Sequence, residues 1–498
     1  MSTSRRTFIK SSLLAAAGAA LPARAWSQVL GANSDIRVAV IGLNGRGRNH
    51  LSSLAKIPGV RVVALCDADT AVLDKVKPTV NNGDVKTYQD IRELLADPNI
   101  DAVTIATPNH WHSLAAIWAL QAGKDVYLEK PVSHNVWEGR QLVNASRKYN
   151  RVIQAGTQIR SGQGLRDAVA WVQAGNLGKI TASRGFCYKR RDSIGKVSGP
   201  QQVPASINYD LWSGPAPLVP PMRNTKNGPV HYDWHWIWLY GNGDVGNQGI
   251  HQMDVARWFL GESGLPHRSL SIGGRLGYVD DGQTPNTQVV LHEFNTAPLI
   301  FEVRGLPRRA GVAGSGGDPR AMQGAGGNDM DRYRGVDIGN VIDCEGGSVI
   351  VTSYTSAHAV DKNGTTIKEW KGSDRHMENF IDVVRSRKTS DLYGPIEEGH
   401  VSSALCHLGN ISHRIGMATP EGQLREKIKG SSVLSEAHGR MVEHLAANNC
   451  DLAQTPLTLG VPLLVDAKAE RFTGPETQQA NSYLSRQYRA PFVVPSIT

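Results

Sequence analysis

The chain has 498 residues, of which 40% are hydrophobic and 20% charged, and its formal net charge is +9. This length allows two substantial domains, each with its own core. The small charge excess over so long a chain does not indicate a nucleic-acid-binding protein. The five cysteines include no Cys-x-x-Cys pair, so the sequence predicts neither a disulfide framework nor a metal site: Cys66, Cys187, Cys344, Cys406 and Cys450.

Residues 1–25 have the layout of an export signal. Ser4-Arg5-Arg6-Thr7-Phe8-Ile9-Lys10 precedes an apolar run, and Ala23-Arg24-Ala25 offers a small-x-small cleavage site. The paired arginines favour the twin-arginine route and a periplasmic or otherwise exported protein. A basic disordered tail is the alternative. Signal removal lowers the net charge from +9 to +5 and leaves no segment apolar and long enough to anchor the protein in a membrane.

A dinucleotide-binding motif comes next. Residues 36–41 are predicted to form a buried parallel strand that runs into the segment from Gly42 to Gly47, and a helix follows over residues 48–55. A second strand over 61–66 ends at Asp67, 20 residues after Gly47. Strand, glycine turn, helix, strand and acidic residue at this spacing predict dinucleotide binding.

The chemistry of that motif assigns its residues to a cofactor. Glycines let the backbone approach the pyrophosphate, whose charge is favoured by the helix amino end. Asp67 is expected to accept hydrogen bonds from the adenosine ribose, which favours NAD over NADP. Asn44 replaces the middle glycine and tolerates left-handed backbone better than most residues. The predicted cofactor contacts here are Gly42, Asn44, Gly45, Arg46, Gly47 and Asp67.

Further strand–helix units extend the pattern and predict a doubly wound parallel sheet. The predicted elements are strands over 102–106, 125–128 and 151–156, and helices over 113–122 and 136–149. Because ligands bind at the carboxyl ends of such strands, residues that follow them are candidate cofactor contacts: Thr107, Asn109, His112, Glu129 and Lys130. His112 is equally compatible with a buried histidine that packs the start of its helix. Pro131 holds Lys130 on a rigid corner.

Two segments of the second half suggest a sugar-binding surface. Tyr188 to Arg191 follows a strand-like stretch and would bind an acidic or polyhydroxylated group if it lined the cleft; a solvated basic loop is the alternative. Trp234, Trp236 and Trp238 alternate, so an extended segment would present all three on one face for stacking on sugar rings. A core strand or an interface explains them equally well. The predicted substrate contacts are Tyr188, Arg191, Trp234, Trp236 and Asn247.

Two later regions carry less chemistry. Residues 311–327 are rich in glycine and are interpreted as a surface insertion or lid. Residues 431–498 are interpreted as a carboxyl-terminal extension that packs against the second domain.

The motifs above, in this order, resemble the glucose–fructose oxidoreductase and inositol dehydrogenase family, often called Gfo/Idh/MocA. The segment from Gly243 to Trp258 is similar to the family's second signature, and residues 376–380 and 398–404 are similar to its final helices. The resemblance implies an α/β protein: an NAD(P)-binding Rossmann domain with a doubly wound parallel sheet (35–155), then an α/β domain with a large, mostly antiparallel sheet (156–430). It also implies sugars, cyclitols or their derivatives as substrates, and a homodimer or homotetramer.

The resemblance assigns two catalytic roles. Lys130 matches the lysine that binds substrate and assists proton transfer, and His251 matches the histidine that takes the hydroxyl proton. Many members have an aspartate four residues before that histidine, where this chain has Asn247. An amide stabilises an imidazolium less than a carboxylate does. Asp244 is a candidate substitute, and Asp254 is expected to be structural.

Together these features predict an exported NAD-dependent oxidoreductase that acts on a hydroxyl of a sugar, cyclitol or glycoside and retains its cofactor. One alternative is NAD-dependent glycoside cleavage, in which transient oxidation permits elimination without net redox change. Another is a non-catalytic sugar-binding protein. No metal and no nucleic-acid partner are expected.

Overall fold

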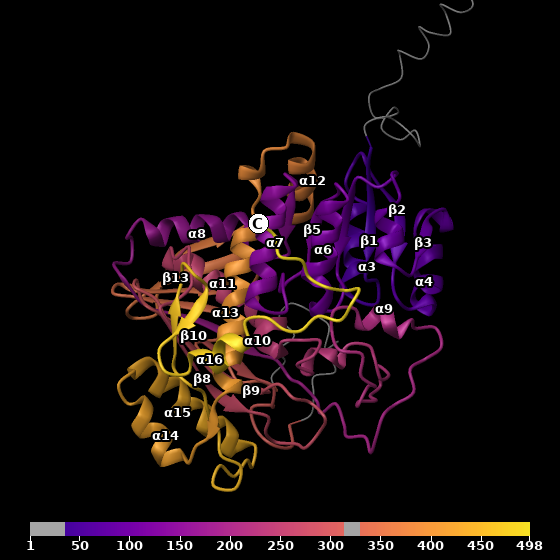
Figure 1. Cartoon of the computed structure of the whole chain (residues 1–498). Coiled ribbons are helices and arrows are strands. Elements are labelled where there is room, and N and C mark those ends of the chain that lie inside the picture. Colours follow the sequence, from indigo (N-terminus) through magenta and orange to yellow (C-terminus); the bar gives the residue numbers. More distant parts are fainter. Residues whose placement is uncertain (1–34, 313–328) are drawn as a thin grey trace, which may run out of the picture.

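The computed structural model describes residues 35–312 and 329–498. Near its amino-terminal end the described chain forms a parallel sheet with strand order β3-β2-β1-β4-β5-β6 (Figure 1). β4 and β5 are buried along their whole length, as expected for central parallel strands covered on both faces. The strands are β1 (Ile36–Ile41), β2 (Val60–Cys66), β3 (Lys86–Tyr88), β4 (Ala102–Ile105), β5 (Asp125–Leu128) and β6 (Ile153–Ala155). This sheet confirms the predicted Rossmann domain.

Helices cover both faces of the parallel sheet. One hydrophobic cluster joins the sheet to α5, α6 and α7, and another joins its opposite face to α3 and α4. The helices are α3 (Arg46–Leu54), α4 (Thr70–Val76), α5 (Ile91–Leu95), α6 (His112–Gln121) and α7 (Val136–Lys148). The bounds of α3, α6 and α7 differ from the predicted ones by at most two residues, and α4 and α5 had not been predicted.

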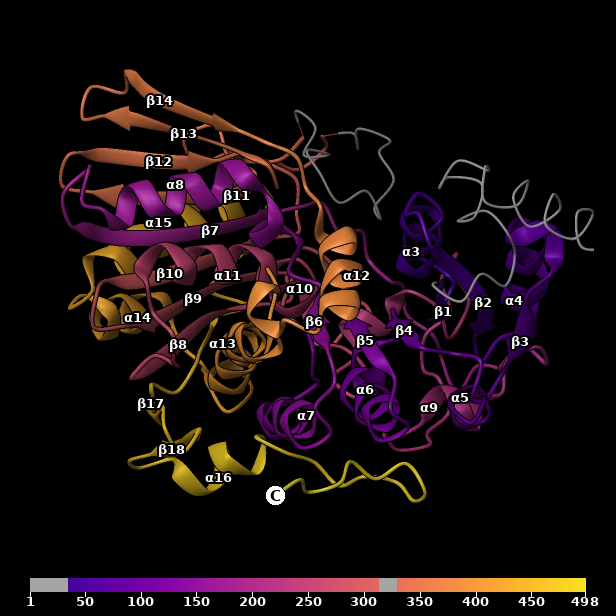
Figure 2. The same cartoon turned by 90° about the horizontal axis from the view of Figure 1, so that it is seen from above.

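A helix from much later in the chain completes the Rossmann domain. Met377 and Phe380 of α12 (His376–Ser386) belong to the same hydrophobic cluster as Val38 and Val40 of β1. In Figure 2, α12 lies between the large sheet and the Rossmann strands. The predicted domain boundary at residue 155 therefore separates α12 in sequence from the domain against which it packs.

The second half is built on a large mixed sheet, and its main strand order is β14-β13-β12-β11-β7-β10-β9-β8. β7 and β10 pair in parallel, whereas the other neighbouring pairs in this order are antiparallel. The strands are β7 (Ile180–Tyr188), β8 (Arg268–Gly274), β9 (Thr287–Glu293), β10 (Pro298–Arg304), β11 (Ile338–Cys344), β12 (Gly347–Val351), β13 (Ser356–Asp361) and β14 (Thr366–Lys371). This confirms the predicted large, mostly antiparallel sheet.

The faces of the large sheet are covered differently. On one face, α11 (Gly249–Leu260) and α13 (Ile396–Arg414) pack against the strands, while α8 (Gln163–Gln173) packs against β13 and β14. On the other face, α14 (Glu421–Ile428) and α15 (Ser432–Ala447) share a hydrophobic cluster with β8, β9 and β10. α15 therefore covers part of this sheet face within the same chain, and the homo-oligomer that the resemblance implies stays a prediction.

The carboxyl-terminal extension divides between the two halves. α15 packs on the second domain, as predicted, and three short strands of the extension continue the sheet: β16 (Thr458–Leu459), β17 (Leu463–Asp466) and β18 (Arg471–Thr473). β16 pairs with β15 (Met417–Ala418), which precedes the extension. After α16 (Thr477–Ser482), however, the chain returns to the Rossmann domain (Figure 2). Phe492 packs edge-on against Trp111, at 5.5 Å between ring centroids, and joins the core of α6. The predicted packing therefore holds for only part of the extension.

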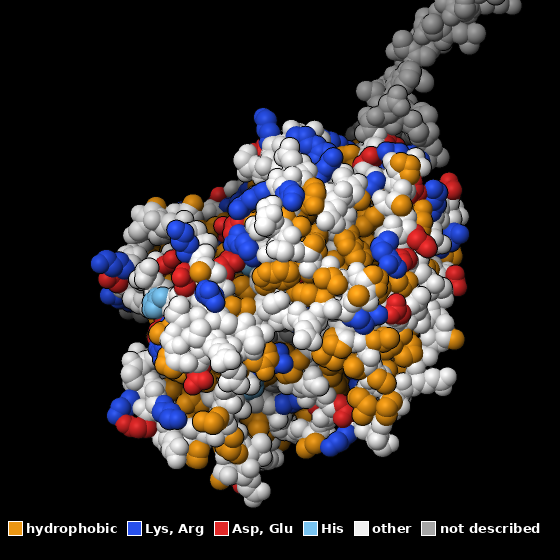
Figure 3. Space-filling model, viewed as in Figure 1, with side chains coloured by type: hydrophobic (Ala, Val, Ile, Leu, Met, Phe, Trp, Pro, Cys, Tyr) orange, Lys and Arg blue, Asp and Glu red, His pale blue; other side chains and the backbone are white. Residues whose placement is uncertain are grey.

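The surface carries mixed charge. On the face drawn in Figure 3, Lys and Arg side chains are scattered among Asp and Glu. Among the residues that the structure describes, no helix combines the length and apolar character needed to span a membrane. The predicted export signal and almost all of the glycine-rich segment 311–327 lie outside the described residues.

Candidate active site

A cavity of about 730 Å³ lies at the carboxyl ends of the parallel strands. Because the order of adjacent strands is β2-β1-β4-β5, the residues that follow them lie side by side in that order. The cavity is thus lined in turn by Asp67, the glycine loop, Thr107 and Lys130. The predicted site residues on its wall are Gly42, Asn44, Gly45, Arg46, Asp67, Thr107, Asn109, His112, Glu129, Lys130, Trp234 and Asn247.

The glycine loop fits a pyrophosphate. Gly42 has φ +84°, and a Cβ there would lie 2.6 Å from the carbonyl oxygen of Ala106. A Cβ on Gly47 would lie 1.9 Å from the carbonyl oxygen of Gly42, so this glycine permits close packing of α3 on β1. Gly45 faces open space and caps α3 without a side-chain hydrogen bond. The loop and the helix amino end can therefore receive an anion closely.

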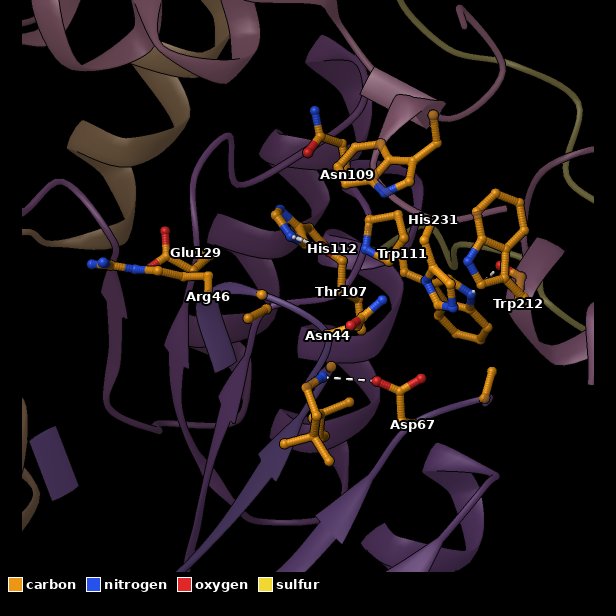
Figure 4. Close-up of a pocket in the computed structure, with 18 of the residues that line it drawn as sticks. Asn44, Arg46, Asp67, Thr107, Asn109, Trp111, His112, Glu129, Trp212 and His231 are labelled. Carbon is orange, nitrogen blue, oxygen red and sulfur yellow. Dashed lines mark hydrogen bonds and ion pairs between the residues drawn. The ribbon is translucent and has the colours of Figure 1, made fainter. Parts of the chain in front are cut away.

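The adenosine end is formed by the turn after β2. The amide of Leu43 donates a hydrogen bond of 2.8 Å to Asp67 Oδ2, which is the dashed line at Asp67 in Figure 4. The amide of Asp69 donates one of 3.1 Å to Oδ1. Burial raises the pKa of the Asp67 carboxyl, while these amides and His231 oppose the rise. The carboxylate is thus fixed at the cavity wall, where a ribose hydroxyl can donate to it.

Residues 206–240 of the second half cross over to this end of the cavity; we call them the cover segment. The amide of Asn208 donates to the carbonyl of Ala68 at 2.9 Å, and the amide of Thr70 donates to that of Ser206 at 2.9 Å. His231 Nε2 lies 2.8 Å from Asp69 Oδ2. The segment includes α9 (Tyr209–Ser213) and is held directly against the turn that carries Asp67.

The cover segment supplies cavity residues that the sequence analysis missed. Trp212 and His231 line the cavity together with Trp111, and they lie beside one another in Figure 4. The Trp111 indole nitrogen donates to the carbonyl of Trp212 at 3.0 Å. The sequence could have indicated Trp111, because it lies within the predicted cofactor-contact segment after β4. Nothing in the sequence around Trp212 or His231 indicates a cofactor site.

Glu129 is held by basic and polar side chains from two other elements. Its Oε1 accepts hydrogen bonds from Arg46 at 2.9 Å and Gln158 at 3.0 Å, and His50 Nε2 lies 3.1 Å away. Burial would raise the pKa of Glu129, but the Arg46 charge and the His50 contact hold it well below its usual value. The carboxylate therefore ties the glycine loop to the corner that carries Lys130.

His112 has features of both predicted roles, a cofactor contact and a buried histidine that packs the start of its helix. It lines the cavity, yet its side chain is buried, with Nε2 2.8 Å from the carbonyl of Thr107 and Nδ1 2.5 Å from that of Pro131. Burial lowers its pKa. The ring connects the ends of β4 and β5 and so positions Lys130.

Lys130 lies at the other end of the cavity. Its Nζ donates a hydrogen bond to the backbone carbonyl of Asn247, at the carboxyl end of α10 (Gly243–Asn247). Burial lowers the pKa of Lys130 to about 8; Glu129 opposes this shift, while Arg46 and Lys189 add to it. A lysine with such a pKa can exchange a proton near neutral pH.

His251 lies behind this wall on α11. It is 1% exposed, and the described residues provide no hydrogen-bond partner for either ring nitrogen. Burial and the positive charge of Lys130 hold its pKa well below the usual value, so the ring is neutral. The structure therefore brings Lys130 to the cavity surface and leaves His251, the other predicted catalytic residue, beneath it.

The proposed partner of His251 is corrected. Asp244 instead pairs with Arg191, at 2.6 Å from Oδ1 to Nη2. Asp254 accepts hydrogen bonds from Arg160 and Ser402 and is structural, as expected. Neither carboxylate orients His251, because both are saturated by other buried partners.

The structure places two predicted substrate contacts, Tyr188 and Arg191, away from the cavity wall. Tyr188 points to the face of β7 opposite α11, where its hydroxyl donates to Glu302 at 2.7 Å. Arg191 is buried, and its guanidinium stacks on Trp236 at 5.0 Å besides pairing with Asp244. Neither side chain lines the cavity, but Lys189 between them does. Lys189 follows Tyr188 directly, and its side chain points to the other side of the chain because side chains alternate at the end of a strand.

The tryptophan face is also corrected. Residues 233–236 form a 3-10 turn, η5 (Asp233–Trp236), so the alternating rings do not share a face. Trp234 lines the cavity and stacks on His235 at 3.7 Å, whereas Trp236 is buried in a separate apolar cluster. Trp238 lies under Arg414. Of the three, Trp234 lines the cavity and Trp236 and Trp238 do not.

The cysteines and metal-binding residue types add no further site to the described part of the chain. All five cysteines are free, and Cys66 is buried in β2 as predicted. No group of three or more His, Cys, Asp or Glu side chains in residues 35–312 and 329–498 is arranged to hold a metal ion.

Two family models match the chain over the regions described above. Residues 36–157 match the NAD-binding Rossmann fold of the Gfo/Idh/MocA oxidoreductase family, and residues 166–274 match its carboxyl-terminal α/β domain. The chain belongs to this family. Its amino-terminal domain is accordingly an NAD-binding Rossmann domain, which the glycine loop and Asp67 fit.

Curated relatives are similar over a limited length. A glycosyl hydrolase family 109 protein of Shewanella sp. (strain W3-18-1) is 30% identical over 155 residues, which are 29% of this chain and 33% of that protein. A second protein of that name from Shewanella sp. (strain ANA-3) is 29% identical over 200 residues, 35% of this chain and 44% of the relative. The match thus spans less than half the length of these relatives.

A solved structure supports the fold over a larger share of the chain. The WlbA dehydrogenase of Bordetella pertussis, solved with NADH and UDP-GlcNAcA, superposes with a TM-score of 0.54 at 19% identity. The superposition covers 76% of this chain and 97% of that one. At this identity the similarity concerns the two-domain architecture.

Proposed function

We propose that the chain is an NAD-dependent oxidoreductase that acts on a hydroxyl of a sugar, cyclitol or glycoside and holds its cofactor tightly. The observation that carries this proposal is one continuous cavity from the glycine loop and Asp67 to Lys130 and Asn247. NAD, when bound, supplies the hydride acceptor. The residues at the far end then have to bind the hydroxyl and move its proton.

Lys130 is the residue best placed for that work. Its ammonium group can donate a hydrogen bond to the substrate oxygen, and its lowered pKa lets it take part in proton exchange. His251 remains the proposed acceptor of the hydroxyl proton, since a neutral imidazole has a free lone pair. Because His251 lies behind Lys130, the proton can reach it only through Lys130 or through a substrate group that extends to it.

Tight retention of NAD is supported by the cover segment. Its main-chain hydrogen bonds to Ala68 and Thr70, and the contact of His231 with Asp69, close the cavity beside Asp67. A cofactor under such a cover dissociates only when these contacts open. Retention also suits export with the cofactor already bound, since free nucleotide is scarce outside the cytoplasm.

The test uses protein purified without added nucleotide. It is denatured, the released nucleotide is identified, and the nicotinamide absorbance of the native protein is recorded as sugars and glycosides are added. Stoichiometric NAD that is reduced by one class of sugar supports the proposal. A site that fills only when NAD is supplied contradicts retention, and no reduction by any hydroxyl compound contradicts the oxidoreductase function.

A second candidate is glycoside cleavage through transient oxidation and elimination. The glycosyl hydrolase family 109 relatives favour it, although the match spans only 33% and 44% of the two relatives described. The two functions differ in exchange with solvent. Deuterium from heavy water at the carbon beside the oxidised one, together with release of the aglycone, supports cleavage; release of an oxidised sugar without exchange contradicts it.

We also propose export by the twin-arginine route, which rests on residues 1–25 alone. Replacing Arg5 and Arg6 by lysine should keep the protein in the cytoplasm, as followed by cell fractionation. Unchanged export of this double variant contradicts the proposal.

A further inference from the structure

Residues 483–498, which we call the tail, lie across the helices of the Rossmann domain. The amide of Trp137 in α7 donates a hydrogen bond to the carbonyl of Leu484 at 2.9 Å. The amide of Ile497 donates to Gln141 Oε1 on the same helix at 2.7 Å. In Figure 2 the tail, drawn in yellow, runs past α7 and α6. The tail is therefore attached to the NAD-binding domain at two separate points.

The tail also binds both ends of the cover segment. Arg489 Nη2 donates to the carbonyl of Asp210 in α9 at 2.8 Å, and its Nη1 pairs with the carboxylate of the same residue. Near the other end of the cover segment, Arg486 Nη1 donates to the carbonyl of Leu239 at 3.0 Å. Arg486 Nη2 lies 3.5 Å from the carbonyl of His110, in the turn after β4. The tail thus joins the cover segment to the Rossmann domain.

Trp111 connects the tail to the cavity. Its indole nitrogen donates to the carbonyls of Leu211 and Trp212 at 2.9 and 3.0 Å, and all three residues line the cavity. A Cβ on Gly214 would lie 2.2 Å from the Trp111 ring, so the cover segment rests directly on this ring. Phe492 of the tail packs edge-on against the same ring. Displacement of the tail would therefore loosen the ring that supports the cover segment.

The contacts of the tail differ in how easily they can open. Phe492 is 1% exposed and belongs to the core of α6. Arg486 Nε lies 3.6 Å from the fully buried Glu138, so its loss would leave a buried carboxyl with one partner fewer. The side chains of Arg489 and Asp210 are 22% and 54% exposed. This pair can therefore separate without exposing the core.

We propose that the tail is a clasp on the cofactor site: bound NAD leaves when residues 483–498 and the cover segment open together, and Arg489 couples the two. This inference rests on the proposed function, because it explains how a retained cofactor is held. Arg489 and Phe492 are positioning residues, since neither lines the cavity. They act through α9 and Trp111.

The first measurement is a chase of labelled NAD by unlabelled NAD on the whole protein. Arg489→Gln should speed NAD dissociation about two- to fivefold, the range for a partly exposed ion pair. Asp210→Asn should do the same, and the two changes together should add little, because both remove one contact. Arg489→Lys should restore part of the retention. Arg268→Gln is the matched control, because Arg268 forms a similar partly exposed pair with Glu293 in the second domain.

The second measurement is amide hydrogen exchange with and without bound NAD. Because coupling between two sites is reciprocal, a tail that retains NAD must itself be protected by NAD. The amides of Phe492 and Ile497 should be slowed by the same factor as the amide of Asn208 in the cover segment. The amide of Val465 on β17 is the reference and should change less. In Arg489→Gln the protection of the tail by NAD should fall.

Two results would overturn the clasp. One is NAD dissociation from Arg489→Gln that is no faster than from Arg268→Gln. The other is exchange of the tail amides at the same rate with and without NAD, even if Arg489→Gln loses NAD faster, because Arg489 would then act on α9 alone.

The outcomes separate this inference from the proposed function. Coupled loss of NAD and of tail protection, without reduction of NAD by any hydroxyl compound, supports the clasp and contradicts the oxidoreductase. Reduction of NAD by a sugar in a protein whose tail is not coupled to NAD does the reverse. A protein that neither carries nor takes up NAD contradicts both.

Discussion

The two ends of the cavity are built in different ways. The adenosine end contains residues from neighbouring positions of one motif, Gly42 to Asp67, and it is acidic where Asp67 and Asp90 line it. The reacting end joins Lys130, Lys189 and Asn247, which come from three distant segments. The comparison shows that a local motif builds most of the adenosine end, with the cover segment packed on it, whereas the opposite end depends wholly on the packing of distant segments.

The largest effect is expected from removing the lysine at the reacting end. Lys130→Met should lower turnover about 1,000-fold, within the range for loss of a proton-transferring group, and leave NAD bound. Single-turnover absorbance and the nucleotide content of the purified variant measure both properties. Lys148→Met, at an exposed position on α7, serves as the control. Turnover above a tenth of the wild-type value would rule out the assigned role.

The pH dependence tests the same residue without changing the chain. The pKa of Lys130 is lowered to about 8, so its ammonium form disappears as pH rises through that value. If the ammonium group binds the substrate oxygen, turnover should fall about tenfold per pH unit above 8. Lys130→Arg should move this decline to higher pH, even at reduced activity. A rate that rises through pH 8 would instead identify neutral Lys130 as the base.

At the adenosine end, substitutions at two glycines test whether the loop needs glycine for packing or for close approach of the cofactor. Gly47→Ala places a methyl group against the Gly42 carbonyl and should lower the free energy of unfolding by about 1–3 kcal/mol, as measured in urea. Gly45→Ala faces open space and should keep the stability but weaken NAD binding. If both variants lower the free energy of unfolding equally, both glycines are needed for packing, and the assigned role of Gly45 in NAD binding is contradicted.

The smallest effect concerns the cover segment. His231→Gln replaces the imidazole that contacts Asp69 by an amide and should speed NAD dissociation about two- to fivefold, because contacts between partly exposed polar side chains are weak. A chase of labelled NAD by unlabelled NAD measures the rate. His267→Gln changes an exposed histidine and should have no effect. An unchanged rate in His231→Gln would show that the main-chain hydrogen bonds alone hold the cover.

The sequence determined the first domain and its ligand. Continuous apolar strands, Gly42 to Gly47 and Asp67 stand at fixed spacings because each part of this motif acts on neighbouring backbone. Lys130 was predictable for the same reason, since it follows a strand whose place in the sheet is set by alternation with helices. The family resemblance likewise predicted the large sheet of the second domain.

Tertiary structure alone decided the rest of the site. Tyr188 and Lys189 are adjacent in sequence, yet the direction of β7 in the sheet sends one to the outer face and the other into the cavity. Trp212 and His231 line the same cavity as Asp67 only because the cover segment crosses between domains. Asp244 is unavailable to His251 because Arg191 is folded against it. Local propensity cannot encode such contacts, because the partners are brought together only by packing of the whole chain.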